Sequence, residues 1–472
     1  MLFSILHCYS SMEVFDAIII GAGQAGIPLA KKLAEAGWKT VLVEKRLVGG
    51  TCINDGCTPT KALVASARMA YLASRSQDFG IDIAHYTLNF EAVMARKDAI
   101  VSQFRAGSLK GIKATENLYL KYGNAEFTSN NEILIKGKDG KNEALSSQYI
   151  FLNTGASPLL PEIEGVNDIK YLTSTSILSL KEVPEHLLIV GGGYIGLEFA
   201  QMFRRFGSIV TLLEKGNRLM PTEDDDVCEV MSEIFEEDGI TVLTKTKAIK
   251  FENYGTERIR VTVDGPGAQK TYTCTHVLLA TGRKPQTDNL GIDKTDIICD
   301  DRGYIQVNDQ LETAVKNVYA LGDVKGGPAF THTAYNDYVV VTKNLLSEGK
   351  LSIKGRLVPY CMFTDPQLGR VGITESEAIE QGLDYLVTKI PMKHVARAIV
   401  TAETRGFMKA VIDKKTKQIL GATVIGQEGG EVMSILQMAM LGGLTYEQIR
   451  YTIFAHPLYA ESLNNLFMSL DA

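Results

Sequence analysis

The chain has 472 residues, of which 45% are hydrophobic and 22% charged, and this balance predicts a soluble globular protein of about three domains. A net charge of -6 and an isoelectric point near 5.8 argue against binding to nucleic acid or to an anionic membrane. Seven scattered cysteines do not form the pattern of a secreted disulfide framework, so we expect a reducing, cytoplasmic setting. The N-terminus has no basic region before its short apolar run, which argues against a signal peptide and leaves Met12 as an alternative start to Met1.

Residues 16–44 run in the order strand, glycine-rich turn, helix, strand and acid. In such a unit the amides of the helix N-terminus bind a pyrophosphate, and the final carboxylate accepts hydrogen bonds from ribose hydroxyls. The acid is Glu44, which follows the first glycine by 23 residues. The segment therefore predicts a dinucleotide site whose turn consists of Gly21, Gly23 and Gly26.

Two cysteines, Cys52 and Cys57, stand five residues apart where the next helical pattern begins. Such a pair can close a small disulfide loop, and a helix N-terminus would stabilise the thiolate that remains when the loop opens. The glycines around the pair let the backbone pass close to a flavin, so we expect Gly50 and Thr51 to contact the cofactor. The alternative is two unrelated buried cysteines, which would leave these glycines without a purpose.

Further along the chain, residues 118–122 and 132–136 are expected to form strands of an antiparallel insertion. The insertion ends in a strand that leads to Thr154 and Gly155, and a similar strand later in the chain leads to Gly282. Each of these turns would let the crossing chain return over a bound nucleotide.

A second dinucleotide-binding unit is predicted between these two turns, and it ends on Glu214. This carboxylate would accept from a free ribose hydroxyl and repel a 2′-phosphate, so NADH is favoured over NADPH. Nearby Arg218 has two interpretations, a solvated surface charge or a phosphate ligand. The other expected nucleotide contacts are Gly191, Gly193, Tyr194 and Gly196.

The last part of the chain carries two further candidates. A buried strand within residues 313–323 ends on Asp323, which is suited to accept from a ribityl hydroxyl of a flavin. After residue 349 the pattern changes to a separate α+β domain, with strands expected at 357–364, 386–391, 406–412 and 419–425 and a helix at 431–441. Near its end, His456 precedes Glu461 by five residues and could donate a proton from a tautomer that the carboxylate fixes.

With these motifs in this order, the chain resembles the flavin-dependent pyridine nucleotide-disulfide oxidoreductases, which include dihydrolipoamide dehydrogenase, glutathione reductase and mercuric reductase. The resemblance extends over residues 12–470 and implies an α/β fold with two Rossmann-like FAD/NAD(P)-binding domains and a C-terminal α+β dimerisation domain. The implied limits are 12–157 and 284–349 for the two parts of the FAD-binding domain, 158–283 for the NAD(P)-binding domain and 350–472 for the dimerisation domain.

The resemblance also implies how electrons move. Hydride passes from NAD(P)H to FAD and then to a Cys52–Cys57 disulfide. Cys57 is the thiol that forms a charge-transfer complex with the flavin, and Cys52 attacks the substrate.

Other residues take roles from the same resemblance. Lys61 and Glu198 occupy the positions of an ion pair near flavin N5, and Tyr194 resembles the aromatic gate over the nicotinamide site. The family consists of homodimers, in which the pair corresponding to His456 and Glu461 serves the cysteines of the other subunit.

The branches of this family differ in the compound that accepts the electrons, and the sequence does not decide between them. Residues 395–398 and 404–409 are most similar to the mercuric-reductase branch, but residues 466–472 lack the vicinal cysteine pair of those enzymes, and His456 belongs to the disulfide-reductase version. We therefore expect a small disulfide or a metal ion as acceptor and no resident metal, with dihydrolipoamide dehydrogenase as the alternative. A non-catalytic flavoprotein redox sensor is a third possibility, against which the complete set of redox residues argues.

Overall fold

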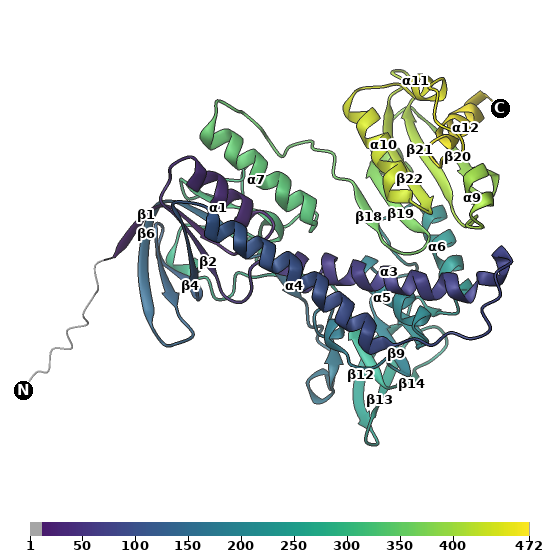
Figure 1. Cartoon of the computed structure of the whole chain (residues 1–472), viewed down its shortest axis with the longest axis horizontal. Helices are drawn as coiled ribbons and strands as arrows, with labels where there is room; N and C mark the ends of the chain where they lie inside the picture. Colours follow the sequence, from purple (N-terminus) through teal and green to yellow (C-terminus); the bar gives the residue numbers. More distant parts are fainter. Residues whose placement is uncertain (1–11, 472) are drawn as a thin grey trace, which may run out of the picture. The chain divides into compact units, whose positions relative to one another are not determined.

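The computed structural model describes residues 12–471 and divides into two compact units (Figure 1). Unit 1 contains the described residues up to Pro59 together with 98–158 and 283–356, and unit 2 contains 60–97, 159–282 and the described residues from 357 onward. The division falls within two helices, α3 (Cys57–Ser74) and α4 (Phe90–Ala114). Cys8 lies outside the described residues. Across 12–471, the helices are all too short or too polar to cross a membrane.

Unit 1 is built on one mainly parallel sheet in the order β3-β2-β1-β6-β5-β4, with β17 paired to β6. The second half of strand β1, residues 17–20, is a continuous apolar and buried run because both faces of the sheet are covered there. Ala17 and Ile19 pack with Leu29 and Leu33 of α1, whereas Ile18 faces a second cluster. The elements are β1 (Glu13–Ile20), α1 (Gly26–Glu35), β2 (Thr40–Glu44), α2 (Gly50–Asn54), β3 (Leu118–Tyr122), β4 (Asn124–Ser129), β5 (Glu132–Lys136), β6 (Asn142–Leu152), β7 (Ala156–Pro158), β16 (Arg283–Pro285), β17 (Val318–Ala320) and α7 (Thr331–Leu346).

Two expectations for unit 1 need correction. Strand β3 is not part of an antiparallel insertion, because it pairs in parallel with β2, with Thr40 opposite Leu118. The long helical connection between β2 and β3 permits this crossover, while β4 and β5 alone form the antiparallel hairpin that returns to β6. Strand β17 is also shorter than expected, and Asp323 lies in the following short 3-10 helix, Gly322–Lys325.

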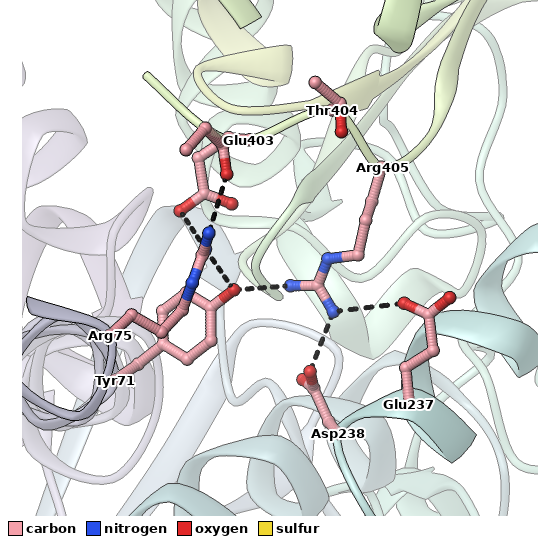
Figure 2. A pocket seen from close by; sticks show the side chains of 8 residues that line it. Tyr71, Arg75, Glu237, Asp238, Glu403, Thr404 and Arg405 are labelled. Carbon is pink, nitrogen blue, oxygen red and sulfur yellow. Dashed lines mark hydrogen bonds and ion pairs between the residues drawn. The ribbon is translucent and has the colours of Figure 1, made fainter. Parts of the chain in front are cut away.

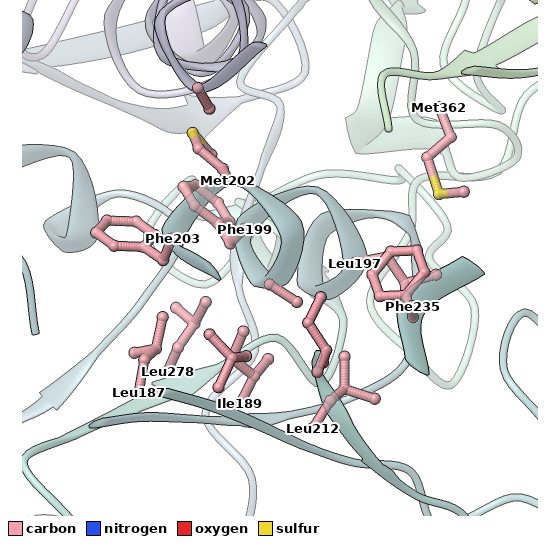
Figure 3. Close-up of a cluster of buried hydrophobic side chains, with 14 of the residues drawn as sticks. Leu187, Ile189, Leu197, Phe199, Met202, Phe203, Leu212, Phe235, Leu278 and Met362 are labelled. Atoms are coloured by element: carbon pink, nitrogen blue, oxygen red, sulfur yellow. The ribbon is translucent and has the colours of Figure 1, made fainter. Parts of the chain in front are cut away.

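The first part of unit 2 has a parallel five-stranded sheet in the order β11-β10-β9-β15-β8. Helix α5 covers this sheet, and Figure 3 shows Leu197 and Phe203 of α5 above Leu187, Ile189 and Leu278 of the strands. A separate antiparallel sheet, β12-β13-β14, follows. The elements are β8 (Tyr171–Leu172), β9 (His186–Val190), α5 (Tyr194–Arg205), β10 (Ile209–Leu213), α6 (Asp225–Glu237), β11 (Thr241–Leu243), β12 (Lys247–Tyr254), β13 (Arg258–Asp264), β14 (Lys270–Cys274) and β15 (His276–Leu279).

The C-terminal part of unit 2 is an antiparallel sheet in the order β18-β19-β22-β21-β20, on which α10 packs through Met433 and Leu436. The expected strand at 357–364 is reduced to β18, and β19 was not predicted. The predicted α/β fold class with a C-terminal α+β part is confirmed. The elements are β18 (Tyr360–Met362), β19 (Gln367–Gly372), α8 (Glu375–Glu380), β20 (Tyr385–Pro391), α9 (Ala396–Val400), β21 (Phe407–Asp413), β22 (Ile419–Gly426), α10 (Gly429–Leu441), α11 (Tyr446–Arg450) and α12 (Ser462–Met468).

Candidate active site

The first glycine turn joins β1 to α1 and has no room for a side chain at its glycine positions. Gly21 has a φ of 107°, and a Cβ there would lie 2.2 Å from the carbonyl oxygen of Asn153. A Cβ on Gly26 would lie 2.1 Å from the carbonyl oxygen of Gly21. The turn is therefore restricted to glycine, and it leaves the start of α1 without a side-chain cap.

Glu44 and Gly50 complete this turn. One carboxylate oxygen of Glu44 accepts from the amide of Ala22 at 2.9 Å, and the other accepts from the amide of Arg46 at 2.7 Å. The segment that contains Thr51 approaches the turn closely, since a Cβ on Gly50 would lie 2.8 Å from the Cα of Gly23. The predicted nucleotide residues of this unit thus lie around one turn.

Two groups after β6 and β17 fit the expected flavin. The Oγ1 atom of Thr154 is buried without a hydrogen-bond partner, which is unusual for a hydroxyl and fits a polar group of a ligand. Burial raises the pKa of Asp323, and Arg283 lies 3.8 Å from its carboxylate. The amide of Gln286 donates to the carbonyl of Gly155 at 2.9 Å and fixes the turn after β6. Together with the glycine turn, these residues offer a hydroxyl, a carboxylate and backbone amides with which a bound nucleotide could form hydrogen bonds.

The two predicted redox cysteines lie in two consecutive helices. Cys52 lies in α2 and is half-buried, whereas Cys57 is the first residue of α3 and is exposed. The Sγ atom of Cys57 lies 3.5 Å from the Oγ1 atom of Thr331. The loop is held by Asn54, which donates to the carbonyl of Gly50 at 2.9 Å.

Two of the other cysteines have thiols whose pKa is raised by burial. Burial raises the pKa of Cys228 to about 11 and the pKa of Cys274 to about 12. Thiols with such values are not ionised at neutral pH, so they are poor nucleophiles. Among the cysteines of residues 12–471, Cys57 is the one at the first residue of a helix.

Lys61 and Glu198 form the predicted ion pair within unit 2. The Nζ atom of Lys61 lies 2.6 Å and 2.8 Å from the two carboxylate oxygens, and Glu198 is only 5% exposed. The amide of Phe363 donates to the same carboxylate at 2.8 Å, and its ring lies 4.8 Å from the ammonium. The two charges satisfy each other, which a buried carboxylate requires.

The second glycine turn repeats the packing of the first. A Cβ on Gly196 would lie 2.1 Å from the carbonyl oxygen of Gly191. The carboxylate of Glu214 accepts from the amides of Gly192 at 2.8 Å and Gly216 at 2.6 Å. Helix α5 follows the turn, capped by Gly193 without a side-chain hydrogen bond, and begins with Tyr194, which is 38% exposed.

Two residues bordering this turn have defined partners. Arg218 forms an ion pair with Asp225 and donates to the carbonyl of Pro221 at 3.1 Å, which favours its interpretation as a surface charge. The carbonyl of Gly282 accepts from the amide of Leu159 at 2.9 Å, so the predicted turn after β15 is held in place.

His456 and Glu461 are brought together as predicted. The Nδ1 atom of His456 lies 3.0 Å from a carboxylate oxygen of Glu461. The histidine side chain is 72% exposed, so this hydrogen bond fixes the ring while the other nitrogen faces outward. In residues 12–471 no cluster of three or more metal-binding side chains is present.

Sequence reasoning missed three residues that build these sites. Asn153 accepts from the amide of Gly26 at 2.9 Å and donates to the carbonyl of Leu321 at 3.0 Å. Asp337 accepts from the amide of Gly322 at 2.8 Å, and Phe363 contacts the ion pair described above. A polar residue at the end of the buried strand β6 was a signal for Asn153, whereas the other two depend on tertiary contacts.

A polar pocket in unit 2 has no predicted site residue in its lining (Figure 2). Its charged groups pair with one another: Arg405 lies 2.7 Å from Asp238, and Arg75 lies 3.3 Å from Glu403. Arg75 also donates to the hydroxyl of Tyr71 at 2.7 Å. We interpret the pocket as an ion-pair cluster that joins segments of unit 2.

Replacing Asn153 with alanine should destabilise the first glycine turn. The buried amide of Gly26 and the carbonyl of Leu321 would each lose a partner, at a cost of about 1–3 kcal/mol per group. Thermal unfolding and the flavin retained after gel filtration measure the effect. The control is Asn130→Ala, whose side chain makes an exposed hydrogen bond with Asp296; equal losses in both variants would contradict this role.

Comparison with known proteins shows the family directly. Residues 15–337 match the pyridine nucleotide-disulphide oxidoreductase family, and residues 358–467 match the dimerisation domain of that family. The chain is 38% identical over 460 residues to the probable pyridine nucleotide-disulfide oxidoreductase RclA of Escherichia coli, covering 97% of this chain and 99% of RclA. It is 34% identical to a dihydrolipoyl dehydrogenase of Chlamydia trachomatis, covering 95% of each chain.

Two further matches belong to the same family of enzymes. A mercuric reductase of Staphylococcus aureus is 34% identical, with 97% of this chain and 82% of that enzyme covered. A solved structure described as the Cu(II) complex of the HOCl-induced flavoprotein disulfide reductase RclA from Escherichia coli superposes with a TM-score of 0.89, at 37% identity, covering 97% of this chain and all of that chain. Proteins of this family depend on FAD and use NAD(P)H. The chain belongs to the pyridine nucleotide-disulphide oxidoreductase family and is a flavoprotein disulfide oxidoreductase.

Proposed function

We propose that this protein oxidises NADH and delivers the electrons through Cys52 and Cys57 to a small disulfide or a soft metal ion. The observation that carries the proposal is the position of the thiol pair, with Cys57 on the first residue of α3 and Cys52 five residues earlier. FAD, when bound, accepts hydride from the nicotinamide and supplies two electrons to a disulfide. The remaining steps belong to side chains of this chain.

We assign different chemical roles to the two thiols. The family resemblance assigns Cys57 as the thiol that receives the electrons, and Cys57 begins the helix that also carries Lys61 one turn further on. Cys52 then attacks the acceptor, and Cys57 displaces the product by reforming the disulfide. By the family resemblance, Lys61, held by Glu198, supplies a positive charge near flavin N5.

The thiol assignment predicts different losses in two variants. Cys52→Ser should keep flavin reduction by NADH but lower turnover with an external disulfide by about 10³-fold or more, because the attacking nucleophile is gone. Cys57→Ser should also remove the long-wavelength absorbance of the reduced protein. Stopped-flow absorbance and steady-state NADH oxidation measure both. Cys299→Ser is the matched control, and a similar loss there would contradict the assignment.

A panel of acceptors tests the chemical class. We expect NADH oxidation with small disulfides, including oxidised lipoamide, or with Cu(II) and Hg(II) ions. No turnover with any of these acceptors would favour the redox-sensor alternative. Turnover confined to lipoamide would identify the protein as a dihydrolipoamide dehydrogenase.

The pair His456 and Glu461 favours a disulfide as acceptor, because a departing thiolate needs a proton and a metal ion does not. Cu(II) is the second candidate, since RclA of Escherichia coli has been solved as a Cu(II) complex. Exposed apolar side chains near His456, such as Tyr451 at 71% and Ile453 at 98%, fit a surface that a second subunit covers. We therefore propose that His456 acts on the cysteine pair of the partner subunit.

Mixing two inactive subunits tests this arrangement. His456→Ala should leave flavin reduction by NADH nearly unchanged and slow reoxidation by a disulfide by about 10²-fold, the usual scale of acid-base loss. Hybrid dimers with Cys52→Ser subunits should regain one active site, built from the intact cysteines of one chain and the intact histidine of the other. Proven hybrids without activity would place the site within one subunit.

The preference for NADH rests on Glu214, whose carboxylate lies at the second glycine turn, and on Arg218, which is paired with Asp225. Glu214→Gln should reduce the discrimination against NADPH, because the repulsion of the 2′-phosphate is removed. The ratio of kcat/KM for the two nucleotides measures this effect. A wild-type ratio above one for NADPH would overturn the preference and assign Arg218 to the phosphate.

A further inference from the structure

The first residues of two helices meet at the side chain of Cys57. Cys57 is the first residue of α3, which has 18 residues, and Thr331 is the first residue of α7, which has 16 residues. The Sγ and Oγ1 atoms lie 3.5 Å apart although the residues are 274 positions apart in the chain, and both belong to unit 1. Tertiary folding therefore adds a second helix N-terminus to the one that the thiol already has.

This arrangement favours a negative charge on the sulfur. The N-terminus of a helix carries a partial positive charge, and a thiolate at such an end is stabilised. Helix α7 has no side-chain cap of its own, since Phe330 precedes it and supplies no side-chain hydrogen bond. A hydroxyl at its first residue can donate to a thiolate, which only accepts, and can accept from a protonated thiol.

We propose that Thr331 is a positioning residue for the redox pair, whose hydroxyl donates to the sulfur of Cys57 and holds that sulfur as a thiolate where α3 and α7 begin. The inference rests on the proposed roles of Cys52 and Cys57. Two electrons from NADH break the sulfur–sulfur bond, and one proton is bound by Cys52 while Cys57 keeps the negative charge. Thr331 stabilises that product without exchanging electrons or protons itself.

The test measures the ionisation of Cys57 directly. In a Cys52→Ser background, which prevents disulfide formation, the holoprotein is treated with iodoacetamide over a range of pH, and labelling of the Cys57 peptide is followed by mass spectrometry. Only the thiolate reacts, so the midpoint of the labelling rate reports ionisation. Thr331→Val should raise this midpoint by about one pH unit, as expected for the loss of a hydrogen bond to a charged group.

Two further variants separate the hydroxyl from other effects. Thr331→Ser retains the hydroxyl and should restore the parental midpoint. Thr342→Val makes the same substitution within α7, at a hydroxyl that donates to the helix carbonyl of Tyr338, and should leave the midpoint unchanged. If Thr331→Val does not fold with bound flavin, Thr331→Ala replaces it.

The outcome does not depend on turnover. An unchanged midpoint in Thr331→Val or Thr331→Ala, with Cys57 still labelled, would overturn the proposal for Thr331. Failure of the proposed function appears separately, as normal disulfide turnover in Cys52→Ser with Thr331 intact. A second readout uses the reduced protein with both cysteines present. As the pH is lowered, the long-wavelength absorbance should disappear when Cys57 becomes protonated. This loss should occur at a higher pH in Thr331→Val than in Thr331→Ser.

Discussion

The start of helix α3 is the constraint on which the proposed redox chemistry depends. Because the helix begins at Cys57, the sulfur that we propose to react is at the positive end of the helix, and Lys61 follows one turn later on the same face. The glycines and the short helix α2 before α3 hold the loop in place, with Asn54 bonded to the loop backbone.

The ion pair between Lys61 and Glu198 stabilises a buried negative charge. Glu198 is almost fully buried, yet its carboxylate has an ammonium and a backbone amide as partners. Removing either partner would leave a buried charge without compensation, which is far more costly than the net contribution of the pair. This pairing lets a helix with an apolar face, α5, carry a carboxylate at a buried position.

The two glycine turns share the same close packing of the backbone. In each, the glycine at the start of the helix lies against the carbonyl of the first glycine of the turn, and a carboxylate at the end of the next strand accepts from a turn amide. The first turn has an additional contact, since Asn153 joins it to Leu321, the residue after β17. The polar side chains therefore fix the backbone of both turns, whose shape is typical of turns that bind a pyrophosphate through their amides.

The sequence by itself determined both glycine turns, the cysteine pair and the close approach of His456 to Glu461, because each is encoded by residues close together in the chain or by a fixed local pattern. The pairing of Lys61 with Glu198 was available only through the family resemblance. The structure alone decided the parallel pairing of β3, which depends on how a long connection crosses the sheet. It also decided the contacts of Asn153 with Gly26 and of Thr331 with Cys57, which join residues more than 100 positions apart. Local patterns specify turns and helix ends, whereas contacts between distant segments arise only when packing brings those segments together.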